Sequence, residues 1–101
     1  MSSRKPLPLK FAPKAWQDFI DILRYTGESW GQAQLLIYRN KINGALQAIS
    51  QNPQVGHGRN ELSETHRTHL VGSHVIVYRI DADSIGVVRI LHQRMSPARH
   101  I

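Results

Sequence analysis

The residues best suited to chemistry lie in the C-terminal stretch 87–101. This stretch opens with Val, Ile and Leu residues interrupted by Arg89, a run typical of a strand inside a sheet. The tail that follows has too few apolar residues to extend a core, and it carries Arg94, Arg99 and His100. A guanidinium group binds phosphate or carboxylate through two parallel hydrogen bonds. We therefore predict a cationic end that contacts an acidic or nucleic-acid-bearing target.

The sequence offers no residue set with the spacing that catalysis or metal binding requires. His66 and His69 are three apart on a predicted strand, so their side chains point to opposite faces. The segment Gly56–Gly58 lacks the Lys-Ser ending and the following helix of a phosphate loop, so we predict a turn there. No pair of carboxylates is spaced for acid–base work, and Asp18 is expected on the exposed side of a helix. We expect no catalytic residue, no metal and no cofactor.

Two further arginines, Arg79 and Arg89, interrupt strands that otherwise consist of Val and Ile. Burying such a charge alone is costly. Each arginine can extend to a sheet edge or pair with a carboxylate such as Asp81 or Glu64. Alternatively, one of them lies on an open face of the sheet together with the tail arginines. The sequence leaves both arrangements open.

Composition narrows the class of protein. The chain has 101 residues, of which 41% are hydrophobic, enough for one small domain spanning residues 1–101. A net charge of +6 favours acidic partners such as nucleic acid, a nucleic-acid enzyme or an acidic protein. Cysteine is absent, which excludes disulfides and is compatible with the cytoplasmic location that we expect. The basic start at Met1 precedes no apolar segment, and no run approaches the ~20 residues of a membrane span.

The first half of the chain is predicted to form a strand and two helices. Residues 7–11 alternate apolar and polar side chains beside two prolines, which indicates an edge strand. A first helix begins at Pro13 and is expected to end at Gly27 in a left-handed cap. A second helix, from about Trp30 to Gln51, is expected to begin with a capping box at residues 29–32. The short connection predicts an antiparallel helical hairpin.

The second half is predicted to be a loop followed by an antiparallel meander. The loop covers residues 54–64, and the strands lie near residues 67–71, 74–80 and 84–91. The order is therefore β-α-α-β-β-β, an α+β fold in which the helical hairpin packs on a small antiparallel sheet.

Both faces of this sheet are predicted to be apolar. On the strand 74–80, Val75 and Val77 point to one face and Ile76, Tyr78 and Ile80 to the other. On the last strand, Val87 and Leu91 are expected to oppose Val88 and Ile90. The helical hairpin covers one face. Either the N-terminal segment or the loop covers the other, or a partner lays an amphipathic segment on it. If the chain covers that face itself and neutralises both strand arginines, the docking interpretation loses its basis.

Several motifs, taken in order, resemble one known family. They are Trp30-Gly31-Gln32-Ala33, Asn52-Pro53-x-x-Gly56, Arg59-x-Glu61-Leu62, the strand from Gly72 to Arg79, and Val88 to Met95 followed by Arg99-His100-Ile101. Over nearly its whole length the chain resembles the ParE toxins of bacterial toxin–antitoxin modules, a branch of the RelE/ParE superfamily. The family fold is a helical hairpin on a small antiparallel sheet.

The resemblance implies a growth-inhibiting toxin that traps DNA gyrase on cleaved DNA. A ParD-type antitoxin would neutralise it by wrapping an acidic, amphipathic segment over it, without a small-molecule substrate or a membrane. The residues implied for target binding are Arg89, Arg94, Met95, Arg99 and His100. The residues implied for antitoxin binding are Arg59, Arg67, Tyr78 and Arg79.

An alternative is a resemblance to the RelE branch, whose members are endonucleases that cut messenger RNA on the ribosome. These use an arginine on the middle strand of the last three, where this sequence has Val75, and often a C-terminal tyrosine or histidine. No tyrosine follows Tyr78, although His92, Arg94 and His100 could supply a substitute set. Loss of a fixed cation from a phosphoryl-transfer site costs orders of magnitude in rate, so we favour the non-catalytic branch.

A second alternative, from another class, is a plain nucleic-acid-binding module. No helix has the basic face of a recognition helix, because the second helix has only Arg39 and Lys41 close together.

Overall fold

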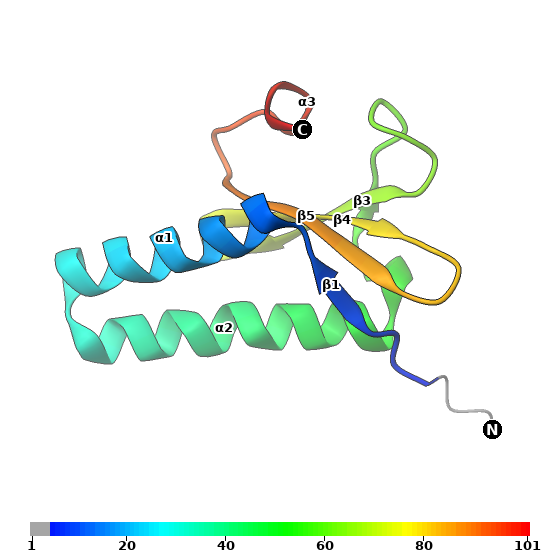
Figure 1. Cartoon of the computed structure of the whole chain (residues 1–101). Helices are drawn as coiled ribbons and strands as arrows, with labels where there is room; N and C mark the ends of the chain where they lie inside the picture. Colours follow the sequence, from blue (N-terminus) through cyan, green and yellow to red (C-terminus); the bar gives the residue numbers. More distant parts are fainter. Residues whose placement is uncertain (1–4) are drawn as a thin grey trace.

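A computed structural model describes residues 5–101, and the N-terminal start at Met1 lies outside the described residues. The elements are β1 (Leu9–Phe11), α1 (Pro13–Trp30), α2 (Gln32–Gln51), the 3₁₀ helix η1 (Pro53–Val55), β2 (His57–Gly58), β3 (His66–Val71), β4 (His74–Ile80), β5 (Ile85–His92) and α3 (Pro97–His100). Figure 1 shows α1 and α2 as an antiparallel hairpin on one side of the sheet, with α3 on the other. The predicted α+β fold is confirmed.

The sheet has the strand order β1-β5-β4-β3-β2. The predicted meander is confirmed, since β3, β4 and β5 pair antiparallel. The edge position of β1 is also confirmed, but this strand is shorter than residues 7–11 and pairs in parallel with β5, from Leu9↔Ile85 to Phe11↔Val87. The predicted loop 54–64 contains most of η1 and the short β2, which pairs with β3.

The boundary between the two helices differs from the prediction. Helix α1 continues past Gly27 to Trp30, and Gly31, with φ 93° and ψ 171°, separates it from α2. Ser29 therefore lies inside the last turn of α1, so the predicted capping box is wrong. Gly27 serves helix packing instead, because a Cβ there would lie 2.8 Å from Cδ1 of Leu35 in α2.

The main core lies between the helical hairpin and the sheet. Its largest buried side chains are Phe19, Ile42, Leu46, Ile49, Ile76, Tyr78, Ile85, Val87 and Ile90. A β-bulge shifts the pairing of β4 with β5 between Val77 and Tyr78. Because the bulge inserts one residue into β5, both Val87 and Ile90 face the helices, and the predicted opposition of these two residues is wrong.

The opposite face of the sheet is buried at its centre. Val77 is 0% exposed and Leu91 2%, although neither belongs to the core under the helices. Two of the chain's own segments, the loop 59–65 and the tail 93–101, lie on this side (Figure 1). The expectation of an open apolar face is therefore wrong for the centre of the face. Of the two covering segments predicted, the loop lies on this side, whereas the N-terminal segment forms the edge strand β1 and the tail, which was not predicted to cover the sheet, lies here instead.

Hydrogen bonds attach these two covering segments to the sheet. In the loop, Arg59 Nε–H donates to Thr68 Oγ1 at 3.0 Å. In the tail, the His100 carbonyl accepts from Arg89 Nη1 at 2.8 Å, and Gln93 N–H donates to the Ser73 carbonyl at 2.8 Å. Among residues 5–101, no helix combines the length and apolar character needed to cross a membrane.

Candidate functional site

The strand arginine of β5 is held by a carboxylate from α1. Arg89 Nε and Nη2 donate to the two oxygens of Asp18 at 2.8 and 2.9 Å, and Ile90 N–H donates to the same carboxylate at 2.9 Å. The side chains of Arg89 and Asp18 are only 17% and 16% exposed. These hydrogen bonds raise the pKa of Arg89 above its ordinary value. Arg89 is thus an internal anchor, and the predicted exposed position of Asp18 is wrong.

The reason for this pairing lies at the edge of the sheet. Strand β1 pairs with β5 only as far as Val87, so beyond that residue β5 has a neighbouring strand, β4, on one side only. Helix α1 packs beside this stretch, and Asp18 supplies the missing acceptor. Asp18 and Arg89 are 71 residues apart in the chain, so no local spacing in the sequence could have revealed the pair.

The C-terminal tail forms a cationic surface next to this anchor. Arg94 and Arg99 are exposed and have no ion-pair partner in the part of the chain that the structure describes, and Met95 is 37% exposed. Arg89 contacts the tail by donating a hydrogen bond to the backbone carbonyl of His100. The ring of His100 is held in turn by the tail itself, since its Nδ1 lies 2.8 Å from the Ser96 carbonyl. The structure therefore brings Arg89 and His100 together and leaves three of the predicted target-binding residues at the surface.

A hollow of about 420 Å³ separates the tail from the start of α1. Lys14, Arg89, His100 and Ile101 contribute to its lining. Lys14 was not predicted as a site residue, because only the parallel pairing of β1 with β5 brings the start of α1 next to the tail.

Two of the four predicted antitoxin-binding residues hold η1 against the sheet. Arg67 donates through Nε to the Gly56 carbonyl at 3.0 Å and through Nη2 to the Gln54 carbonyl at 3.1 Å. Tyr78 donates to the Pro53 carbonyl at 2.7 Å and accepts from Gly56 N–H at 2.9 Å. Burial raises the pKa of Tyr78. Because Tyr78 is 0% exposed, it cannot contact a partner in this conformation, and we withdraw it from the predicted surface.

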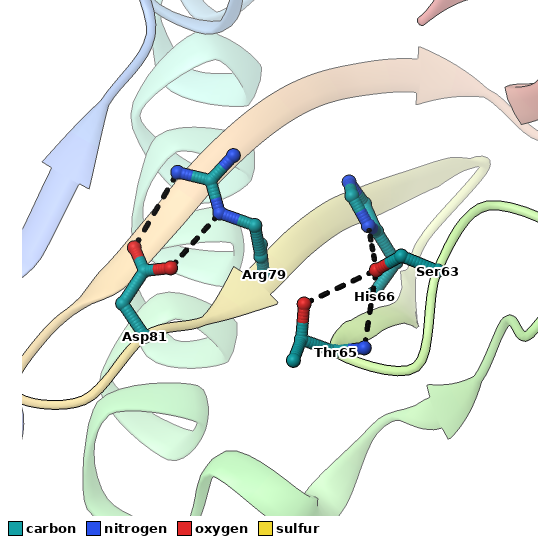
Figure 2. Close-up of polar contacts among 5 residues, drawn as sticks. All are labelled: Ser63, Thr65, His66, Arg79 and Asp81. Carbon is teal, nitrogen blue, oxygen red and sulfur yellow. Dashed lines mark hydrogen bonds and ion pairs between the residues drawn. The ribbon is translucent and has the colours of Figure 1, made fainter.

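The other two residues of that set lie at the surface. Arg79 pairs with Asp81 at 3.0 Å, one of the two partners considered from sequence, and its side chain is 48% exposed (Figure 2). Arg59 lies 3.6 Å from Glu61 and its side chain is 41% exposed. Both arginines are therefore accessible, although each already has an acidic neighbour. Because Arg79 and Arg89 are both paired within the chain and the centre of the second sheet face is buried, the interpretation of that face as an open docking surface is wrong, which leaves the tail and the sheet edges as candidate contact surfaces.

Figure 2 also shows a serine and a histidine in contact. Ser63 Oγ lies 2.7 Å from His66 Nδ1, and it accepts from Thr65 N–H at 3.1 Å. A hydroxyl bound to the backbone two residues ahead is a local turn motif. Burial and the charge of Arg79 lower the pKa of His66, which favours the neutral ring. The 2.7 Å separation is within reach of a nucleophile and its base, but no carboxylate among residues 5–101 is hydrogen-bonded to the His66 ring to orient it, so we assign this cluster to shaping the loop 59–65.

A groove that the sequence did not reveal lies between the helical hairpin and the β3–β4 turn. Two adjoining hollows of about 440 Å³ each share Tyr25, Ser73 and His74. His74 Nδ1 lies 2.5 Å from the Tyr38 hydroxyl, and its ring centroid is 5.5 Å from that of His92. Burial and the nearby His92 lower the pKa of His74.

The substitute nuclease set does not come together. His92 lies on the helix side of the sheet next to His74, whereas His100 belongs to α3 on the other side (Figure 1).

Comparison with known proteins identifies the family. The sequence profile of the ParE toxins of type II toxin–antitoxin systems, parDE, matches residues 9–97. The chain is 33% identical over 102 residues to Toxin ParE1 of Mycobacterium tuberculosis, covering 100% of both proteins. It is 29% identical over 94 residues to Toxin ParE1 of Caulobacter vibrioides, covering 93% of this chain and 97% of the relative.

Solved structures support the same fold. The chromosomal ParDE system from P. aeruginosa contains a chain that superposes with a TM-score of 0.73 at 21% identity, covering 88% of this chain and 98% of the other. A chain of the RelBE2 toxin–antitoxin complex of M. tuberculosis gives a TM-score of 0.63 at 19% identity, with coverages of 86% and 98%. From the profile match and the full-length relatives we conclude that this chain belongs to the ParE toxin family of type II toxin–antitoxin systems.

Proposed function

We propose that this protein inhibits DNA gyrase by trapping it on cleaved DNA, and that a ParD-type antitoxin neutralises it. The observation that carries the proposal is the ParE family match over residues 9–97. The net charge of +6 supports it, because both a DNA-bound enzyme and an acidic antitoxin attract a basic protein. The protein would act in the bacterial cytoplasm, where gyrase works on the chromosome.

We assign target contact to the tail surface formed by Arg94, Met95 and Arg99. The two arginines are exposed and have no ion-pair partner among residues 5–101, so binding a carboxylate or phosphate breaks no existing pair. The hydrogen bond between Arg89 and the His100 carbonyl attaches the tail that carries this surface to β5. In this proposal Arg89 and His100 position the tail and do not themselves touch gyrase.

We assign antitoxin contact to Arg59, Arg67 and Arg79. In this proposal Arg67 keeps its hydrogen bonds to the Gly56 and Gln54 carbonyls and contributes its positive charge. Exposed ion pairs of the kind that Arg59 makes with Glu61 and Arg79 with Asp81 contribute only about 0–1 kcal/mol each. An acidic segment of the antitoxin can therefore take over these arginines at little cost.

A non-catalytic mode of action is supported by the surroundings of Val75 on β4. In the RelE-type arrangement this position would carry a phosphate-binding arginine. The two arginines on the neighbouring strands are already bound, Arg89 on β5 to Asp18 and Arg67 on β3 to the Gly56 and Gln54 carbonyls, so neither is free to substitute. The part of the chain that the structure describes contains no group of three or more ligands for a metal ion.

A supercoiling assay with charge-reversed tails tests this proposal. Purified toxin should inhibit supercoiling by gyrase, and the double variant Arg94→Glu/Arg99→Glu should lose this inhibition while still binding antitoxin. Reversal is preferable to deletion, because the tail is hydrogen-bonded to the rest of the chain through Arg89 and Ser73. Arg39→Glu/Lys41→Glu on the exposed side of α2 is the matched control and should behave like the wild type. Wild-type toxin that leaves gyrase unaffected but cleaves ribosome-bound mRNA would reject the proposal.

A further inference from the structure

Most open edges of the sheet are protected. At the outer edge of β1, Pro6 and Pro8 remove N–H donors and Lys10 is exposed and charged. Along β5 beyond its pairing with β1, the N–H of Ile90 is bound by Asp18. These are the usual ways in which a protein prevents another chain from adding a strand to its sheet.

The outer edge of β3 is different at Leu70. The two-residue turn between Val71 and His74 makes them a hydrogen-bonded pair, so the backbone groups of the next residue, Leu70, point away from β4. The same alternation is seen at His66, whose carbonyl accepts from Arg59 N–H on the outer side. Strand β2 pairs only with Arg67 and Thr68 and so stops short of this position.

Leu70 therefore has no partner on the outer side of the sheet. Among residues 5–101, its N–H and carbonyl have no hydrogen-bond partner on that side, and the residue is 61% exposed. It begins an apolar row across three strands, in which it pairs with Val75 and Val75 pairs with Leu91. The row is fully covered at Leu91, which is 2% exposed, and uncovered at Leu70.

The charges around this edge indicate the kind of partner. Arg59, Arg67, His57 and His69 lie on β2, on β3 or in the adjoining loop, and Glu61 is the one carboxylate within ion-pair distance of them in the described chain. Two copies of this protein joined edge to edge would bring these basic side chains against one another. An acidic segment would meet complementary charge instead.

We propose that the outer edge of β3 at Leu70 accepts an extended, acidic segment of the antitoxin as an additional strand. The backbone of that segment pairs with the N–H and carbonyl of Leu70, and one of its apolar side chains extends the row that runs to Leu91. Arg59 and Arg67 flank the added strand and bind its carboxylates. This inference rests on the proposed neutralisation by an antitoxin and adds the place and mode of contact.

Amide hydrogen exchange, measured residue by residue by NMR, tests this contact. The probe is the purified antitoxin of the same operon, added to the full-length labelled toxin. The Leu70 amide should exchange roughly 100-fold or more slowly in the complex than in free toxin. The amide of Asp83, in the exposed β4–β5 turn, is the control and should not change. Unchanged exchange at Leu70 in a complex that forms normally would overturn the inference and leave the proposed function intact.

A pair of substitutions separates backbone from side chain. Leu70→Pro removes only an outward donor, so the β3–β4 ladder keeps its bonds, and antitoxin binding should weaken at least about tenfold. Leu70→Thr keeps the donor and should weaken binding less. The thermal unfolding of each free variant checks that it is folded. If Leu70→Pro does not fold, the hydrogen-exchange experiment on the wild-type toxin decides the question. Wild-type affinity in a folded Leu70→Pro variant would overturn the inference. If wild-type toxin binds no antitoxin at all, the proposed partner and this contact both fail.

Discussion

Replacing Asp18 with alanine is the most informative perturbation of the framework that carries the tail. The carboxylate accepts three hydrogen bonds of 2.8, 2.9 and 2.9 Å, from Arg89 and from the backbone of Ile90. Alanine leaves a guanidinium that is 17% exposed without a counter-charge. Removing one partner of a buried ion pair costs about 3–5 kcal/mol. For a domain of this size, each kcal/mol lowers the Tm by roughly 4–8 °C.

Two further variants show whether the unpaired charge of Arg89 causes the loss of stability in Asp18→Ala. Asp18→Leu/Arg89→Met removes both charges, so it should recover the lost free energy of unfolding except about 1–3 kcal/mol for the unpaired Ile90 N–H. Asp21→Ala is the surface control, because Asp21 is 56% exposed and lies 3.6 Å from Arg24. It should cost less than about 1 kcal/mol. Urea unfolding measures all of these values.

Two outcomes would refute this reasoning. One is a loss below about 1 kcal/mol in Asp18→Ala, which would place the pair among ordinary surface ion pairs. The other is a double variant as unstable as the single one, which would assign the effect to packing and not to the uncompensated charge of Arg89.

Acidification should lower the free energy of unfolding as the pH falls below about 6.5, the ordinary pKa of histidine. Folding lowers the pKa of His66 and His74, so the unfolded chain binds protons first, and the loss should level off below the folded pKa values. The substitution His74→Gln should reduce this slope in urea unfolding between about pH 7 and 5, and an unchanged slope would exclude His74 as a source. Gly31→Ala should cost about 1–3 kcal/mol, because its φ of 93° and ψ of 171° are essentially restricted to glycine. Its matched control, Gly44→Ala in α2, has nothing within 4 Å of a new Cβ and should stabilise by about 0.5–1 kcal/mol, so equal effects of the two substitutions would contradict this account.

Periodicity was sufficient to predict the two long helices and the three long strands of this fold, but not the short elements η1, β2 and α3. The helical stripe through Phe19 and the alternation in residues 74–80 predicted the hairpin and the meander, because side-chain direction follows directly from helix and strand geometry. Glycine gave a less certain signal. Gly27 was predicted to end the first helix, whereas Gly31 does so, and only the approach of α2 shows that Gly27 lies close to the Leu35 side chain.

Long-range pairing was the part that sequence could not supply. Nothing local connects Asp18 with Arg89, and nothing local indicates that β1 runs parallel to β5. The same holds for the second sheet face, since the tail is attached on that side by the hydrogen bonds that Arg89 and Ser73 make with its backbone. The predicted surface residues therefore divided into exposed ones, such as Arg94, and internal ones, such as Tyr78.

The central claim, that this ParE-family protein acts on gyrase without cutting RNA, is tested most directly by a DNA cleavage assay. Purified toxin is mixed with gyrase, ATP and supercoiled plasmid, and the linear DNA released by detergent and protease is measured. We predict that linear DNA accumulates with toxin concentration and that antitoxin added first prevents this. A plasmid that gyrase processes normally at toxin concentrations that degrade ribosome-bound mRNA would contradict the account.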